Sequence, residues 1–231
     1  MNSTKKAARV AGLLYVLMSI PGAFSLLYVP SVLIVPGDAT ATVNKIQASE
    51  LLFRIGMVSE LICATGFIFV ALALYRLFKG VDKTQASLMV TLFVVSVPIS
   101  FLNVLNQLAV LTLLSGANFL SAFDPRQLNA LVMLFLGLHN DGILLAQIFW
   151  GLWLFPFGVL VFKSGFLPRI LGVLLILACF GYLAISSTFL LLPAYGHIVS
   201  RFAMVLTLGE LPIILWLLIK GAKDQPLDVP A

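Results

Sequence analysis

Long apolar stretches alternate with short polar ones along the whole chain. Six stretches carry almost only apolar residues over about twenty positions, the length that an α-helix needs to cross a bilayer. They cover residues 11–35, 51–78, 86–114, 138–162, 170–192 and 202–219. The pattern predicts an all-α fold, a polytopic membrane helical bundle with six transmembrane helices. We expect a single domain over residues 1–222, followed by a disordered cytoplasmic tail at 223–231.

The connections between the predicted helices differ in length. Two are short turns, KGVDKTQ and KSGFLPR, whereas the stretches after the first and third helices are longer. In the second long stretch Pro125 offers a helix start, and the apolar residues 128–138 predict a helix that lies on the surface or extends the fourth span outward. His197 is expected in the outer loop between the fifth and sixth helices.

Lysine and arginine flank the predicted helices unevenly. The apolar stretch that follows Lys5 and Lys6 continues to about Val35, which is too long for a cleaved signal peptide, so we expect it to remain as the first span. Six spans place both ends of the chain on one side of the membrane. Ten lysines and arginines then flank the helices on that side and four on the other. Because cytoplasmic loops carry the excess, we expect both termini in the cytoplasm, N-in and C-in.

The composition excludes a water-soluble globule. The chain is 61% hydrophobic and only 10% charged, whereas soluble domains carry roughly a quarter charged residues. The net charge of +5 comes from short basic clusters at the helix ends rather than from one basic face, so nucleic acid is not an expected partner. The expected partner is the lipid bilayer. Cys63 and Cys179 fall inside apolar stretches, where reduced packing residues are expected.

Polar residues within each predicted helix follow helical spacing and form one small-and-polar stripe. Since lipid cannot satisfy polar side chains, these stripes should face other helices, and the serines, glycines, cysteines and threonines on them are typical of packing seams. Helical rise places Glu60 and Gln147 about 24 Å from the basic residues that end their helices, with Asn103 at a similar height.

The deeper polar residues are concentrated in the outer half of the predicted bundle. Gln107 lies further out than Asn103, and Glu210 lies lower. This distribution predicts a cavity that opens outward, with Glu210 at its floor and His139 and Asp141 at its rim.

Two carboxylic acids at this depth are the sharpest feature of the sequence. Glu60 and Glu210 should each be a protonated hydrogen-bond donor or be paired. Arg54 and Arg201 lie on other sides of their helices, so any partner must come from another helix. The functional hypothesis is that one acid takes up a proton or holds a polar ligand group. The structural alternative is that the acids fix the helices to one another.

Metal and catalytic chemistry have weaker support. His139, Asp141 and His197 are of ligand type, but they have no fixed short spacing, so we predict neither a zinc site nor a haem. The chain has no HExxH, GxSxG or GxxxxGK[ST] motif, which lowers the odds of a protease or an ATP-driven machine. A lipid-modifying enzyme that uses one Glu and one His remains open.

Several segments together resemble one known group. They are ARVAGLLYVL, LLYVPSVLIVPGDA, PISFLNVLNQLA, SGANFLSAFDPRQLNAL, the long stretch LHNDGILLAQIFWGLWLFPFGVLVFKSGFLPRILGVLL, and LGELPIILWLLIKG. The chain resembles the bacterial membrane proteins catalogued as domain of unknown function 4386. The resemblance covers nearly the whole chain and implies a six-span protein of the bacterial cytoplasmic (inner) membrane. The family has no established activity to carry over, and the cofactors stay unknown.

The leading functional hypothesis is that the protein binds a small or amphipathic molecule in the outward-opening cavity. Transport of that molecule is an extension of this hypothesis. The residues expected to line its site are Glu60, Asn103, Gln107, Gln147, Glu210, His139 and Asp141. One alternative is an intramembrane lipid-modifying enzyme in the same pocket. The other is a structural or partner-binding membrane protein. The sequence specifies neither the ligand nor the oligomeric state.

Overall fold

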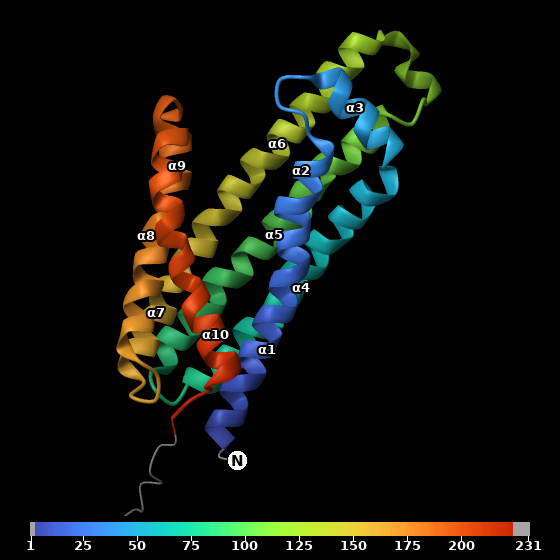
Figure 1. Cartoon of the computed structure of the whole chain (residues 1–231). Helices are drawn as coiled ribbons and strands as arrows, with labels where there is room; N and C mark the ends of the chain where they lie inside the picture. The colour runs from blue at the N-terminus through green and yellow to red at the C-terminus, as the bar shows by residue number, and fades with distance from the viewer. Residues whose placement is uncertain (1–2, 224–231) are drawn as a thin grey trace, which may run out of the picture. The chain divides into compact units, whose positions relative to one another are not determined.

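The structure, a computed structural model, describes residues 3–223, and these form helices joined by short connections, with no strand (Figure 1). The prediction of an all-α fold is therefore confirmed. The helices in chain order are α1 Ser3–Ala23, the π-helix η1 Phe24–Tyr28, α2 Val29–Leu33, α3 Ala39–Ala48, α4 Glu50–Phe78, α5 Lys83–Leu113, the 3₁₀-helix η2 Asn118–Ala122, α6 Pro125–Leu152, α7 Leu154–Lys163, α8 Arg169–Leu191, α9 Pro193–Thr207, the 3₁₀-helix η3 Leu208–Glu210 and α10 Leu211–Ile219.

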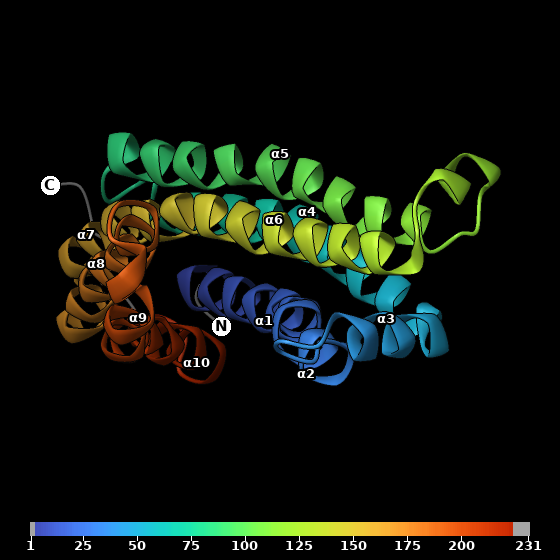
Figure 2. The ribbon, with the colours of Figure 1, turned by 90° about the horizontal axis from the view of Figure 1, so that it is seen from above.

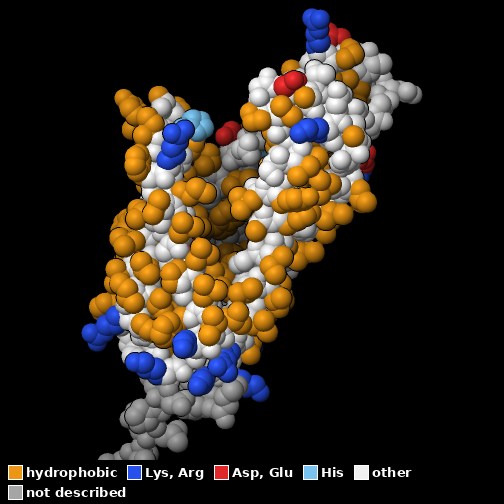
Figure 3. All heavy atoms as spheres, viewed as in Figure 1, with side chains coloured by type: hydrophobic (Ala, Val, Ile, Leu, Met, Phe, Trp, Pro, Cys, Tyr) orange, Lys and Arg blue, Asp and Glu red, His pale blue; other side chains and the backbone are white. Residues whose placement is uncertain are grey.

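Six helical stretches among the described residues are long and apolar enough to cross a membrane, as predicted. They are Thr4–Leu33, Glu50–Phe78, Lys83–Leu113, Pro125–Lys163, Arg169–Leu191 and Pro193–Ile219. Hydrophobic side chains cover much of the face shown in Figure 3, and many large ones are exposed, such as Leu102 at 66% and Phe202 at 75%. Lipid, rather than water, suits such a surface.

Two span boundaries differ from the expected ones. Helix α6 begins at Pro125, so residues 128–138 extend the fourth span instead of lying on a surface. The expected start of the sixth span at residue 202 was wrong, because α9 begins at Pro193 and includes His197, which was expected in a loop. Proline is favoured in the first turn of a helix, where its missing N–H costs nothing. Leu192 alone separates α8 from α9.

The chain divides into two compact units, each built from separate segments. Unit 1 contains Met1–Leu17, Gly66–Ser96 and Gln147–Ala231; unit 2 contains Met18–Thr65 and Val97–Ala146. Helices α1, α4, α5 and α6 each contribute one part to each unit. The single domain over 1–222 stays a prediction, and the predicted tail lies outside the described residues except for Lys223.

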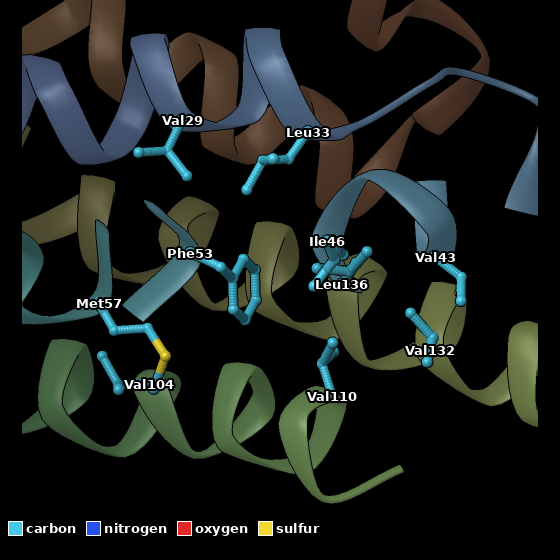
Figure 4. Close-up of a cluster of buried hydrophobic side chains, with 10 residues drawn as sticks. All are labelled: Val29, Leu33, Val43, Ile46, Phe53, Met57, Val104, Val110, Val132 and Leu136. Atoms are coloured by element: carbon cyan, nitrogen blue, oxygen red, sulfur yellow. The ribbon is translucent and has the colours of Figure 1, made fainter. Parts of the chain in front are cut away.

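The apolar core of unit 2 joins five helices. Within this unit α4, α5 and α6 run side by side, and α2 and α3 cover them (Figures 1 and 2). The buried side chains of the core are Val29, Leu33, Val43, Ile46, Phe53, Met57, Val104, Val110, Val132 and Leu136 (Figure 4). Helix α3 lies in a stretch expected to be a connection; Asp38 caps it, with its Oδ1 accepting from the N–H of Ala41 at 2.8 Å.

Small residues set the helix contacts of unit 1. Helix α8 packs against α7 and α9. A Cβ at Gly158 would lie 2.6 Å from the carbonyl oxygen of Gly172, and one at Gly181 would lie 2.9 Å from that of Ala203. Such close backbone approach is possible only without a side chain, which is how membrane helices commonly pack. The small-residue stripes are therefore packing seams at these positions, as expected.

Three spans depart locally from regular α-helical geometry near a proline. The π-helix η1 precedes Pro30 in the first span, Trp153 separates α6 from α7 ahead of Pro156, and η3 precedes Pro212 in the sixth span. In the sixth span the N–H of Leu211 bonds to the carbonyl of Leu208. In a regular α-helix that carbonyl would accept from residue 212, but Pro212 has no N–H to donate. The sixth span therefore tightens to a 3₁₀ turn that ends at Glu210.

Candidate functional site

Four polar side chains from three helices meet inside unit 2. They are Glu60 of α4, Asn103 and Gln107 of α5, and His139 of α6, here named the His139 cluster. Each residue is less than one-tenth exposed, at 8%, 6%, 9% and 7% respectively. Asn103 and Gln107 stand four residues apart and so lie on one face of α5, the face toward α6. This arrangement brings together four of the seven predicted site residues.

The imidazole ring of His139 is the centre of the cluster. Its Nδ1 lies 3.5 Å from the backbone oxygen of Asn103, its Nε2 lies 3.1 Å from the amide nitrogen of Gln107, and the same Nε2 lies 3.5 Å from Oε2 of Glu60. A carbonyl oxygen can only accept and an amide nitrogen can only donate. His139 therefore carries its proton on Nδ1 and accepts the Gln107 N–H at Nε2.

Asn103 fixes α5 against α6. Its Nδ2 donates to the backbone oxygen of His139 at 2.9 Å, and its Oδ1 accepts from Asn106 at 3.1 Å. The same side chain fills the space beside Gly142, where a Cβ would overlap the Asn103 amide. Gly142 thus leaves room for the hydrogen bond that holds His139 in place, a role that one sequence without tertiary contacts does not reveal.

Two oxygens of the His139 cluster have no hydrogen-bond partner among the described residues. They are Oε2 of Glu60 and Oε1 of Gln107, and both atoms are buried. The 3.5 Å from Glu60 to His139 is within ion-pair range but makes no hydrogen bond, because Nε2 is already occupied as an acceptor. Buried acceptors without partners cost free energy, and they are uncommon unless a water or a ligand satisfies them.

A second polar cluster lies in unit 1, around Glu210 of η3. Tyr15 of α1 donates its hydroxyl to Oε1, and Tyr182 of α8 donates to Oε2 at 3.4 Å; we name these three residues the Glu210 cluster. The Tyr15 ring also packs against Phe67 and Trp153, at centroid distances of 5.1 and 6.0 Å. Both carboxylate oxygens therefore have a donor from another helix.

The partners of both acids were foreseen only in part. The expectation that they come from other helices holds for Glu210, which accepts from two tyrosines, whereas Glu60 has a 3.5 Å contact with His139 of α6 and no hydrogen bond at Oε2 among the described residues. The sequence placed Tyr15 and Tyr182 on the polar stripes of the first and fifth spans. A position on a stripe does not show whether a tyrosine donates to Glu210 or only packs against a neighbouring helix.

The remaining predicted site residues lie elsewhere. Gln147 belongs to unit 1, where its buried Oε1 has no hydrogen-bond partner among the described residues. Asp141 is exposed and makes no hydrogen bond or ion pair within residues 3–223. His197 packs edge-on against Phe189 at 5.4 Å. Within that range no three His, Cys, Asp or Glu side chains gather closely enough to hold a metal ion.

Basic residues gather at one end of unit 1 (Figure 3). There Lys163 donates to Oδ2 of Asp82 at 3.1 Å, and Arg9 donates to the backbone oxygen of Ile219 at 3.1 Å. The N–H of Gln85, together with Lys163, lowers the pKa of Asp82, which caps the start of α5. These polar contacts tie helix ends together.

Six apolar helices define a multi-pass membrane protein, and polar side chains are buried among three of these helices. The chain belongs to the family described as Domain of unknown function (DUF4386), whose profile matches residues 10–221. This confirms the family resemblance seen in the sequence. The family description assigns no activity.

Comparison with individual proteins adds little to this. The chain is 40% identical over 79 residues to an "Uncharacterized protein" of Archaeoglobus fulgidus. The matched stretch covers 34% of this chain and 46% of that protein, so this chain spans less than half of its relative's length. No solved structure matches the chain.

Proposed function

We propose that this protein binds a small or amphipathic molecule within the membrane, at the His139 cluster. One observation carries the proposal. Two buried oxygens, Oε2 of Glu60 and Oε1 of Gln107, lie beside one imidazole ring and lack a hydrogen-bond partner among the described residues. A bound molecule that supplies the missing donors would remove the cost of burying both.

The contrast with neighbouring polar groups supports binding over a purely structural role. Asn103 bridges α5 and α6 and is bonded through both its oxygen and its nitrogen, as expected of a residue that joins helices. Glu210 likewise accepts from two tyrosines. Glu60 and Gln107 are as deeply buried as Asn103 but retain open acceptors. That Gln147, Glu210 and Asp141 also contact the ligand remains a prediction.

Transport of the bound molecule would extend this function. Membrane transporters commonly contain helices that depart from regular α-helical geometry, and backbone groups freed at such points bind substrates or ions. The π-helix η1, the turn residue Trp153 and the 3₁₀-helix η3 are irregular points in three of the six spans. An opening of the site toward the outer side, as the distribution of polar residues suggests, would make this a route for uptake or export.

Native mass spectrometry tests the binding proposal. The wild-type protein, released from a mild detergent, is compared with Glu60→Gln and Gln107→Leu. Glu50→Gln is the matched control, since Glu50 is an acid of the same helix, its side chain is 53% exposed, and its ion-pair partner among the described residues is Arg54. Thermal unfolding of each variant shows whether it still folds.

We expect one adduct of defined mass on the wild type and on Glu50→Gln, and its loss from both cluster variants. That mass would identify the molecule as a lipid, a quinone or a small metabolite. An adduct on all four proteins would place binding elsewhere. Bare protein in every sample would favour the structural alternative and a search for a protein partner.

An intramembrane enzyme is the second candidate. The observation in its favour is the 3.5 Å between Oε2 of Glu60 and Nε2 of His139, since a carboxyl and an imidazole this close could act together as acid and base on a substrate bound beside them. Turnover of the molecule found by mass spectrometry, abolished in His139→Gln, would establish it. Recovery of the unchanged molecule after incubation would leave the protein as a binder.

We propose that both termini face the cytoplasm and that the protein resides in the bacterial inner membrane. The uneven distribution of the lysines and arginines supports this orientation, with ten flanking one side and four the other. The basic end of unit 1, where Lys163 and Arg9 lie, would then face the cytoplasm.

A further inference from the structure

We propose that the molecule bound at the His139 cluster carries a primary ammonium group, whose N–H bonds reach Oε2 of Glu60 and Oε1 of Gln107. This inference rests on the proposed function and specifies its ligand class. It follows from three features of the site: which atoms are open, how charge is balanced, and what surrounds the polar atoms.

The buried atoms of the cluster that lack any partner are both acceptors. Oε2 of Glu60 and Oε1 of Gln107 lack partners within residues 3–223. Each donor nitrogen of the cluster already has a facing acceptor, because Gln107 donates one N–H to His139, Asn103 donates one N–H to the backbone of His139, and Nδ1 of His139 faces the backbone oxygen of Asn103. A carboxylate, phosphate or carbonyl group would bring more acceptors to acceptors. The site therefore selects a donor.

Charge balance favours a cation over a neutral donor. Within residues 3–223, no lysine or arginine nitrogen lies within 4.0 Å of the Glu60 carboxylate. The basic side chain of these residues that does lie within 4.0 Å is His139. His139 accepts the Gln107 N–H at the nitrogen that faces Glu60, so the ring is neutral and presents a lone pair to the carboxylate. The ionised form of Glu60, the form that binds a cation, requires a partner of opposite charge inside a membrane helix. An ammonium ion supplies that charge and up to three N–H donors.

The surroundings suit an aliphatic amine. Each of the three helices carries a buried apolar residue within one turn of its polar residue (Figure 4). These pairs are Met57 and Glu60 on α4, Val104 and Asn103 on α5, and Leu136 and His139 on α6. An alkyl chain attached to the ammonium would find apolar contacts there, whereas a polyhydroxylated molecule would not.

The test uses four probes that each carry a straight alkyl chain of about seven or eight carbons and differ in the head group, with the protein in phosphatidylcholine nanodiscs. Octylammonium offers a charge and three donors, octyltrimethylammonium a charge without donors, 1-octanol one donor without a charge, and octanoate only acceptors. Binding is measured by isothermal titration calorimetry, with empty nanodiscs subtracted to remove partition into lipid.

We expect octylammonium to bind at least about tenfold more tightly than each of the other three, since a hydrogen bond to a charged group contributes more than one to a neutral group. Glu60→Gln should remove this preference, while Glu50→Gln should keep it. The comparison among probes on wild-type protein stands even where a variant fails to fold.

The outcomes separate this inference from the proposed function. Equal binding of octylammonium and 1-octanol, unchanged in Glu60→Gln, would overturn the ammonium assignment and leave ordered water as the donor. Tight octyltrimethylammonium binding would overturn the direct N–H bonds. A defined adduct in native mass spectrometry that lacks an amine, lost in Glu60→Gln, would refute the ligand class while supporting the site. Absence of both adduct and probe binding would refute site and ligand class together.

Discussion

His139 and Gln107 face each other with two nitrogen atoms, 3.1 Å apart. Because an amide nitrogen cannot accept, Nε2 of the ring must, and the ring proton stays on Nδ1. We predict that nitrogen-15 spectra of histidine-labelled protein in nanodiscs at neutral pH will show a neutral His139 with the proton on Nδ1. Gln107→Leu, which removes the donor to Nε2, should shift that nitrogen's resonance. The exposed His197 provides the control, since Gln107→Leu should leave its resonances unchanged. A proton on Nε2 would contradict the assignment.

Gly142→Ala should destabilise the protein by about 1–3 kcal/mol, the usual cost of forcing an extra methyl into a packed interior. The new Cβ would overlap the Asn103 amide and break its bond to the backbone of His139. Gly137 lies on the same helix at a position where an added Cβ would meet nothing within 4 Å, so Gly137→Ala should be neutral or slightly stabilising. Unfolding in detergent measures both. Equal effects of the two substitutions would show that the space beside Asn103 does not matter.

Tyr15→Phe should cost about 1–3 kcal/mol of stability, because it leaves one carboxylate oxygen of Glu210 without its donor. Tyr28→Phe is the matched control, since Tyr28 is 52% exposed on the neighbouring π-helix. A double-mutant cycle between Tyr15→Phe and Glu210→Gln isolates the pair. Strictly additive losses would mean that the two side chains do not interact.

The interaction of Asp82 with Gln85 and Lys163 should appear as a pH dependence of stability. The hydrogen bonds lower the pKa of Asp82 in the folded protein, so its charged form contributes stability above the unfolded pKa, and that contribution is lost as pH falls through the folded pKa. We predict that wild type is more stable than Asp82→Asn at pH 7 and that the difference narrows below about pH 4. Asparagine can still cap α5, so the comparison reports the charge. A difference that is constant with pH would argue against it.

The orientation of the chain can be tested with single cysteines in a background that lacks Cys63 and Cys179. We predict that a cysteine at Lys79, in the turn after α4, reacts with an impermeant maleimide only after the cells are lysed. A cysteine at Ser121, in the exposed η2, should react in intact spheroplasts. Labelling in the reverse pattern would place the termini outside.

The class of protein could be predicted from the sequence because it depends on local properties. Length and hydropathy of each stretch are enough to identify a helix that crosses a bilayer, and all six were found. Helical spacing was also enough to predict that Glu60 and Glu210 must find partners on other helices, since Arg54 and Arg201 point elsewhere. The start of the sixth span was missed, because Tyr195, His197 and Arg201 resemble a polar loop although Pro193 starts a helix there.

What the sequence by itself determined is therefore the six helices, the face of each that carries polar groups, and membership of a membrane-protein family. Only the tertiary structure decided which faces meet: Glu60 and Gln107 with His139, Glu210 with Tyr15 and Tyr182, and Asn103 with the space left by Gly142. The physical reason is that a polar stripe can satisfy itself against any neighbouring helix that offers a donor or acceptor. Its partner is chosen by packing among residues far apart in the chain, and helical spacing carries no information about that choice.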